Sequence, residues 1–342
     1  MRLIDPLSDP HWDTRLASLP GASFFHTAAW ARVLHGTYGF KPAYLEGTNE
    51  NGVWSLLPLM EADSWIKGRR GIGLPFTDEC SPLSPDPVSF RPLFTDALAY
   101  ADKRGWKYLE CRGGRSLICD AAASTSFWGH QLDLRGEESA LFERFDPAAR
   151  RAIRKAEQSG LSIETSQSLD AVREFYGLLC LTRRRHGLPA QPFRFFSQIR
   201  EHVLSPGHGC VILARAGGKP VAGAVFFRFG KTVTYKFGAS DDRQQHLRAN
   251  NLVMWEAIKL HAKLGFESLD FGRTSLGNEG LRKFKLGWGT TERRVDYVRF
   301  DCRSDRFVTV PDEASGWYNY VFRILPVSAS RLVGALLYRH AA

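Results

Sequence analysis

The segment from Tyr235 to Gly289 constrains the fold of this chain most strongly, because its pattern predicts strand, helix, strand and short helix in that order. A first strand ends at Phe237. Apolar residues then recur at helical spacing from Leu247 to Leu264, and Gly265 follows as a left-handed C-cap. A short strand over Ser268 to Phe271 comes next. The segment therefore predicts an α/β unit.

Polar residues cluster where the second of these strands ends. Asp270 lies at the end of the strand, Gly272 frees the turn after it, and Lys285 lies on a short helix predicted over Leu281 to Leu286. Sheets of α/β proteins tend to bind ligands at the carboxyl ends of their strands. The pattern indicates a ligand site, and it is equally compatible with a turn-capping aspartate and a solvated lysine.

Four pieces of the segment carry a family resemblance. They read YKFGAS, AN-LVMWEAI, LG-ESLDFGRT and GLRKFKLGWG. In this order and spacing they resemble the Fem family of non-ribosomal peptidyltransferases and its relatives in the GNAT acyltransferase superfamily. The resemblance extends more thinly over most of the chain. It implies an α/β (α+β) fold of two tandem GNAT-like domains, with mixed, mostly antiparallel sheets flanked by helices.

An internal repeat supports two related halves. Lys103 to Glu110 aligns with Lys263 to Asp270, and each copy has a helix end, a glycine, an aromatic residue and a strand that closes on an acid. Chance similarity between two common αβ turns is the alternative. With 342 residues, the chain is predicted to hold an N-terminal domain over 1–140, a C-terminal domain over 141–310 with most of the site, and an amphipathic helical tail over 311–342.

Periodicity and turn residues predict the remaining elements. Helices are expected over residues 24–39, 88–104, 148–160 and 169–185. Strands are expected over residues 43–45, 53–60, 107–112, 129–134, 209–216, 219–228, 232–237 and 294–300. The first two of these strands flank an Asn-Gly turn at residues 49–52, which predicts a hairpin.

Composition limits the partners and the compartment. A formal net charge of +10 favours a polyanionic partner, such as RNA, a nucleotide-linked substrate or an anionic membrane face. The six cysteines show no CxxC pair and no zinc spacing, so we expect free thiols, no metal and a reducing compartment. The N-terminus lacks a secretory h-region and no long apolar run occurs, so a cytoplasmic protein is expected.

Arginines on two predicted helices are candidates for binding an anionic group. A basic amphipathic helix carries Arg150 and Arg154, clustered with Arg151 and Lys155. The cluster indicates a phosphate or tRNA contact, and it is equally compatible with a solvated helix face. Arg185 precedes the Gly187 turn. Cations at a helix C-terminus are favourable in themselves, whereas the resemblance implies that Arg185 contacts a substrate diphosphate.

The resemblance also implies roles in acyl transfer. Lys285 follows Phe284 as in the Fem motif, where the lysine faces the developing oxyanion, and Asp270 would position the amine or a substrate hydroxyl. Tyr235 and Arg273 are expected to line the substrate cleft with Phe284. Fem proteins often have a lysine four residues after a tryptophan of the first helix. That position after Trp30 is Leu34, so Arg32 is the candidate replacement.

The donor is expected to be a co-substrate, with no tightly bound cofactor. Typical GNAT enzymes bind acyl-CoA with a Gln/Arg-x-x-Gly-x-Gly/Ala loop, whose glycines let backbone N–H groups approach a pyrophosphate. The corresponding residues here, Gln245 to Asn250, contain neither glycine. This departure favours aminoacyl-tRNA over acyl-CoA.

The leading hypothesis is a Fem-like aminoacyl or acyl transferase that acts on an amine of an anionic envelope precursor of peptidoglycan or polysaccharide. One alternative is a CoA-dependent N-acyltransferase of exopolysaccharide amino sugars. Another is a non-catalytic tRNA- or membrane-binding protein. The apolar tail from Trp317 to His340, interrupted by arginines and Pro326, is expected either to pack on the core or to lie on the inner face of an anionic membrane.

Overall fold

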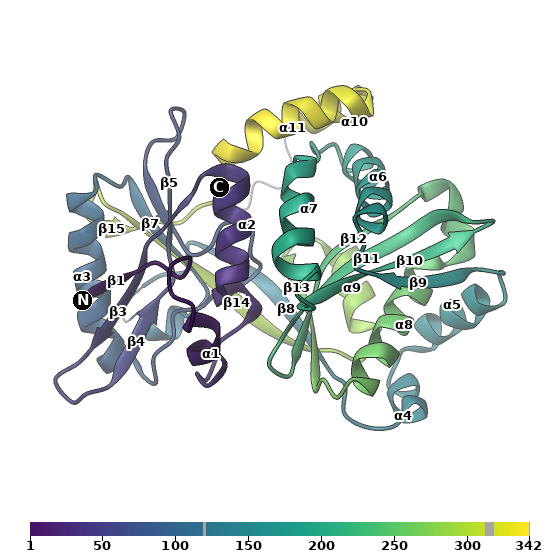
Figure 1. Ribbon diagram of the computed structural model, residues 1–342, viewed down its shortest axis with the longest axis horizontal. Coiled ribbons are helices and arrows are strands. Elements are labelled where there is room, and N and C mark those ends of the chain that lie inside the picture. Colours follow the sequence, from purple (N-terminus) through teal and green to yellow (C-terminus); the bar gives the residue numbers. More distant parts are fainter. Residues whose placement is uncertain (119–120, 312–317, 342) are drawn as a thin grey trace. The chain divides into compact units, whose positions relative to one another are not determined.

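The computed structural model describes residues 1–118, 121–311 and 318–341 (Figure 1). The chain forms two compact units that are not continuous in sequence. Unit 1 contains Met1–Trp128, Arg294–Asp312 and Tyr338–Ala342, and unit 2 contains Gly129–Arg293 and Glu313–Leu337. The chain passes between them within two strands, β8 (Thr125–Asp133) and β14 (Thr291–Asp301). The domain ranges expected from the sequence stay a prediction.

Unit 1 contains two sheets and a long helix. Its helices are α1 (Trp12–Ala17), η1 (Phe24–His26), α2 (Ala28–Tyr38), α3 (Pro87–Lys103) and η2 (Arg115–Leu117). Its strands are β1 (Arg2–Ile4), β2 (Lys41–Pro42), β3 (Tyr44–Thr48), β4 (Trp54–Leu57), β5 (Met60–Ala62), β6 (Arg70–Ile72), β7 (Tyr108–Arg112) and β15 (Arg306–Phe307). One sheet has the order β1-β3-β4, and the other includes β2-β5-β6-β7-β14.

Unit 2 has an antiparallel sheet with one parallel pair. Its strands are β9 (Ser162–Ser166), β10 (Gly209–Ala216), β11 (Lys219–Phe229), β12 (Thr232–Ser240) and β13 (Ser268–Ser275). Its helices are α4 (Glu138–Glu143), α5 (Pro147–Glu157), α6 (Leu169–Arg185), α7 (Phe193–Ile199), η3 (Arg200–Leu204), η4 (Asp242–Leu247), α8 (Ala249–Lys263), α9 (Glu279–Leu286), α10 (Tyr318–Ile324) and α11 (Val327–Ala341). The strands run in the order β13-β12-β11-β10-β9, and only β12 and β13 are parallel among these neighbours.

Helices cover both faces of the sheet in unit 2 (Figure 1). Ala224 and Phe226 of β11 belong to the core cluster that includes Ile258 of α8. Gly223 directly precedes Ala224 in the strand and therefore points to the other face. There a Cβ on Gly223 would lie 3.3 Å from Phe175 of α6. The helices α6 and α8 thus lie on opposite faces of the sheet.

The two copies of the sequence repeat share a helix C-cap. Gly105 follows α3 and Gly265 follows α8, each with a left-handed φ, +65° and +81°. The next amide donates five residues back in both copies, from Trp106 to Ala101 at 2.9 Å and from Phe266 to His261 at 3.0 Å. This bond is the signature of a Schellman cap. The repeat therefore encodes the same helix-to-strand turn twice.

Most predicted elements are present, with changed ends. The predicted helix 24–39 is divided at Thr27, whose hydroxyl caps α2 by accepting from the Trp30 amide. The Asn49–Gly52 hairpin is confirmed by the β3–β4 register. The tail forms two helices separated at Pro326, and its first expected residue, Trp317, lies outside the described residues. The five described cysteines are free, and Cys119 lies outside the described residues.

Candidate functional site

The adjacent strands β12 and β13 separate at their carboxyl ends. Their register runs only from the pair Thr232–Ser268 to the pair Thr234–Asp270. Both strands continue beyond it, β12 to Ser240 and β13 to Ser275. The side chains of Tyr235 and Phe271, the first residues past the register, have ring centroids 6.1 Å apart. The strands therefore form a fork, which begins at the aspartate identified in the sequence.

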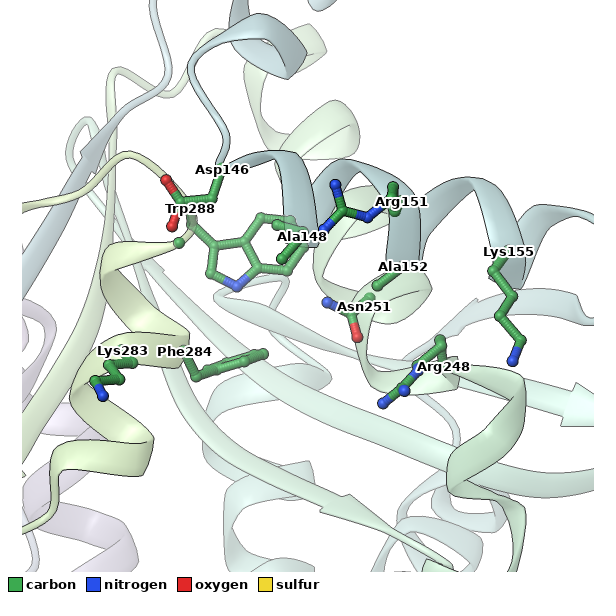
Figure 2. Close-up of a pocket in the computed structure, with 12 residues that line it drawn as sticks. Asp146, Ala148, Arg151, Ala152, Lys155, Arg248, Asn251, Lys283, Phe284 and Trp288 are labelled. Carbon is green, nitrogen blue, oxygen red and sulfur yellow. The ribbon is translucent and has the colours of Figure 1, made fainter.

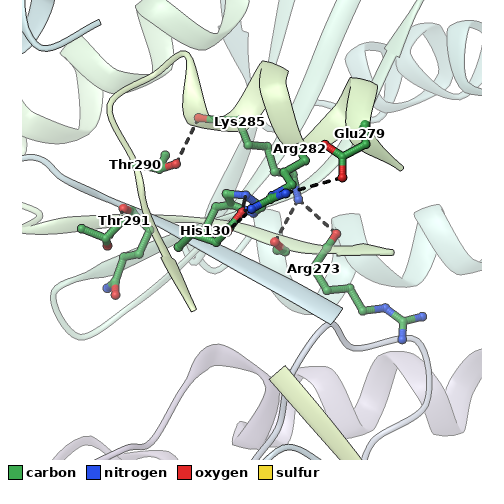
Figure 3. A network of polar contacts seen from close by, with 10 residues as sticks. His130, Arg273, Glu279, Arg282, Lys285, Thr290 and Thr291 are labelled. Carbon is green, nitrogen blue, oxygen red and sulfur yellow. Dashed lines mark hydrogen bonds and ion pairs between the residues drawn. The ribbon is translucent and has the colours of Figure 1, made fainter. Parts of the chain in front are cut away.

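A left-handed kink at Gly272, which we call the bulge, follows the fork on β13. Gly272 has a φ of +68°, and its amide donates to Asp270 Oδ1 at 2.7 Å. Lys285 Nζ donates to the carbonyl oxygens of both Gly272, at 2.9 Å, and Arg273, at 3.0 Å (Figure 3). Successive carbonyls of a regular strand point in opposite directions, so the left-handed glycine turns two of them toward one ammonium. Lys285 is 2% exposed and is not a surface lysine.

A second group of charges fixes the helix that carries Lys285. Arg282 of α9 donates from Nε and from a terminal nitrogen to Glu292, both at 2.8 Å. His130 Nε2 lies 3.0 Å from Glu292 Oε2 (Figure 3). Burial, aided by the Lys285 charge, lowers the pKa of His130. The hydrogen bond from Arg282 lowers the pKa of Glu292. Glu292 of β14 therefore binds α9 through Arg282 and β8 through His130.

A cavity of about 490 Å³ lies at the N-terminus of α8 (Figure 2). Basic side chains from helices α5 and α9 and from the residue just before α8 line the cavity. Arg151 and Lys155 come from α5, Arg248 precedes α8, and Lys283 comes from α9. The remaining lining residues are Asp146, Ala148, Ala149, Ala152, Asn251, Phe284, Gly287 and Trp288. The basic groups outnumber the single carboxylate, so the cavity suits an anionic ligand.

One residue of the backbone at this cavity is left-handed. Arg248 is the N-cap of α8 and has a φ of +56°, which is rare for a residue with a side chain. It occupies the first glycine position of the acyl-CoA loop pattern. The first N–H groups of a helix have no partner within the helix and attract anions. The loop thus keeps the left-handed turn that its sequence did not indicate.

Two predicted site residues lie near this loop and the fork. Phe284 lines the cavity, and its ring centroid is 6.1 Å from that of Trp288. Tyr235 packs on Phe226 with ring centroids 5.6 Å apart, and its hydroxyl lies where a Cβ on Gly238 would be. Burial raises the pKa of Tyr235 to about 12, which keeps the hydroxyl neutral.

The predicted arginines do not come together. Arg150 and Arg154 are on α5 with Arg151, but they are not among the residues that line the cavity, and the Arg154 guanidinium lies 5.5 Å from the centre of the Phe142 ring. Arg185 ends α6, which covers the opposite face of the sheet from α8. Joint binding of one anion by Arg185 and the α5 arginines therefore has no geometric support.

Two further predicted residues lie elsewhere. Arg273 is half-buried on β13, next to the bulge. Arg32 is half-buried on α2 in unit 1, and Leu34, at the position of the Fem lysine, is fully buried. Sequence reasoning missed the cavity residues Arg248 and Lys283, and within the basic cluster of α5 it singled out Arg150 and Arg154 rather than the lining residues Arg151 and Lys155. The basic run in α5 signalled the helix, but its spacing alone does not tell which arginines face α8.

A comparison with protein-family models gives a match within unit 2. Residues 145–291 match the acetyltransferase (GNAT) domain. The match covers less than half of the chain. The matched range begins just before α5, ends at the start of β14, and includes the fork, the bulge and the cavity. A comparison with curated protein sequences gives no match.

Solved structures with the same fold cover most of this chain. FemX has a TM-score of 0.67 at 14% identity, over 86% of this chain and 97% of FemX. A tandem GNAT protein from the clavulanic acid biosynthesis pathway has a TM-score of 0.50 at 12% identity, over 88% and 97%. L-PGS from Bacillus licheniformis has a TM-score of 0.50 at 13% identity, over 86% and 89%. The expected α/β fold of Fem-like, tandem GNAT type is confirmed.

Proposed function

We propose that this chain transfers an aminoacyl or acyl group to an amine of an anionic cell-envelope precursor. The observation that carries the proposal is the basic cavity at the N-terminus of α8, which shares helix α9 with the fork between β12 and β13. An activated donor needs a site for its phosphate-bearing carrier and a nearby place for its carbonyl carbon. The cavity supplies the first, and the fork supplies the second.

The donor carries phosphates in either version of the proposal. Side chains of Arg151, Lys155, Arg248 and Lys283 offer the positive charge that the phosphates of aminoacyl-tRNA or acyl-CoA would need. Aminoacyl-tRNA remains the leading donor because these cations come from separate side chains that suit an extended polyanion. Acyl-CoA is the alternative donor, since Arg248 stands at the first glycine position of the acyl-CoA loop pattern and adopts a left-handed conformation that glycine favours.

The reaction is the attack of a neutral amine on the donor carbonyl. A C–N amide bond forms, the ester or thioester bond to the carrier breaks, and the amine proton passes to the leaving oxygen or sulfur. The oxyanion formed on the way requires positive charge that is already in place. In the proposal Lys285 supplies this charge, because two carbonyls and the surrounding packing hold its ammonium beside the fork. Asp270 and Tyr235 shape the opening.

The acceptor in this proposal is a component of the cell envelope. FemX and L-PGS share the fold of this chain, and so does the C-terminal domain of a lysylphosphatidylglycerol synthetase from Agrobacterium fabrum. These likenesses favour an envelope component as the acceptor. Arg185 and Arg273 are candidate ligands for its anionic groups in unit 2, and Arg32 is a separate candidate in unit 1. The proposed location is the cytoplasm, where charged tRNA and nucleotide-linked precursors occur.

Donor capture distinguishes this proposal from its alternatives. The full chain is incubated with a mixture of charged tRNA and acyl-CoA, and the bound donor is identified by mass spectrometry. Transfer is then measured with the retained donor and a panel of amine acceptors. Capture of charged tRNA followed by amide formation supports the leading version, and capture of acyl-CoA supports the alternative donor. Binding without transfer to any acceptor, or no binding, would contradict the enzymatic proposal.

A further inference from the structure

Helix α11 presents its large apolar side chains to solvent. Leu332 and Leu336, four residues apart on one face, are 67% and 66% exposed. The opposite side holds Ser330 and Gly334, which are buried. A surface helix normally does the reverse and buries its leucines while small polar residues face water. The orientation of α11 therefore leaves a leucine face that the fold of this chain does not use.

Contacts within unit 2 hold the helix in this orientation. A Cβ on Gly334 would overlap the carbonyl oxygen of Ala190, so the backbone of α11 lies directly against that residue. The Arg331 guanidinium lies 5.0 Å from the centre of the Tyr176 ring. Rotating α11 to bury Leu332 would drive a leucine into the space that only glycine fits. The outward direction of the two leucines is a consequence of this packing.

The arginines of the two C-terminal helices are not accompanied by acidic residues in the same segment. Residues 318–342 contain Arg323, Arg331 and Arg339 and no aspartate or glutamate. The preceding helix, α10, adds two exposed apolar side chains, Tyr320 and Ile324. An amphipathic helix with apolar and basic side chains together is suited to the interface of an anionic bilayer. At 1.5 Å per residue, a helix of this length, about 22 Å, is shorter than the hydrocarbon core of roughly 30 Å.

Residues from Tyr338 onward, the last turn of α11, belong to unit 1, and there His340 lies beside an exposed apolar pair of the same unit. His340 Nδ1 is 2.8 Å from Ser64 Oγ, and the His340 ring centroid is 5.7 Å from that of Trp65. Trp65 and its neighbour Ile66 are both exposed, Trp65 to 86%. Tryptophan is enriched at membrane–water interfaces. This pair is a second, separate apolar feature near the same helix end.

We propose that α11 docks this protein on the surface of an anionic lipid bilayer through Leu332 and Leu336. The helix lies in the interface, with the leucines among the acyl chains and the arginines at the headgroups. No described helix is long and apolar enough to cross a membrane. The proposal does not depend on the donor or on the transfer reaction, and it concerns where the protein acts.

Vesicle flotation tests the proposal with the full chain. The probes are phosphatidylcholine vesicles with and without phosphatidylglycerol. Wild type is expected to float with the anionic vesicles and to lose this binding as salt rises. The double variant Leu332→Ser/Leu336→Ser should bind at least tenfold more weakly. A matched control is Val88→Ser/Leu264→Ser, which removes two exposed apolar side chains elsewhere and should bind like wild type.

Three outcomes would overturn the proposal. The first is absence of wild-type binding to anionic vesicles. The second is equal loss in the leucine and control variants. The third is a dimer by light scattering that only the leucine variant disrupts, which would make a second copy the occupant of this face. Circular dichroism and thermal unfolding verify that both variants are folded, which the exposure of all four side chains leads us to expect.

Discussion

The buried ammonium of Lys285 leads to a stability prediction that can be made quantitative. Lys285→Met keeps an unbranched side chain of similar length but removes both donors to Gly272 and Arg273. A hydrogen bond from a charged group contributes about 1.5–3 kcal/mol, and buried carbonyls left without a donor are costly. The expected loss is therefore roughly 3–5 kcal/mol in the free energy of unfolding of unit 2, which corresponds to a Tm lowered by about 10 °C.

Urea and thermal unfolding monitored by circular dichroism measure this loss. Lys283→Met is the matched control, because Lys283 is an exposed lysine on the same helix. It should change the free energy of unfolding by less than about 0.5 kcal/mol. If Lys285→Met is as stable as Lys283→Met, the ammonium does not hold the bulge. The substitution should also abolish most transfer, but rates are interpretable only at temperatures where the variant remains folded.

Two further predictions concern stability. Burial lowers the pKa of His26 and of His261 to about 4, so both are neutral when folded and take up protons on unfolding below pH 6.5. The contribution of these histidines to the free energy of unfolding should be fully present above pH 6.5 and should fall by roughly 2 kcal/mol per histidine by pH 5. His261→Gln should make the free energy of unfolding, measured by urea titration, depend less steeply on pH. An unchanged pH dependence would show that His261 is not buried in its neutral form. Gly177 lies in α6 with open space where a Cβ would be, so Gly177→Ala should raise the free energy of unfolding by about 0.5–1 kcal/mol. Gly238→Ala should lower the free energy of unfolding, because the new Cβ displaces the Tyr235 hydroxyl. A higher Tm for Gly238→Ala than for Gly177→Ala would contradict the described packing.

The central α/β segment was predictable from its sequence because local signals determine it. Helical periodicity defined α8, and Gly265 defined its end through a turn that needs a left-handed residue. The matching cap at Gly105 followed from the same residues in the repeat. Short or irregular elements such as α1 and β9 were missed, since a few residues carry no clear period.

The site was predictable only in part. Lys285 and Asp270 were identified from motif position, but the bulge that joins them depends on a backbone turn at Gly272 and on long-range packing of α9. The absence of glycines at Gln245 to Asn250 suggested a different loop, whereas Arg248 adopts the left-handed conformation regardless. Spacing placed Arg150 and Arg154 on one helix face without telling which face meets α8.

Paired charge variants of α5 test the central claim most directly. Arg151→Gln/Lys155→Gln removes two cations that line the cavity, and Arg150→Gln/Arg154→Gln removes two from the same helix outside the lining. The measurement is the affinity of each variant for charged tRNA and for acyl-CoA as a function of salt.

The account predicts at least tenfold weaker donor binding for the cavity pair, with a salt dependence shallower by up to about two in log–log slope, and near wild-type binding for the outer pair. Equal affinities of the two double variants would contradict a donor site at the N-terminus of α8.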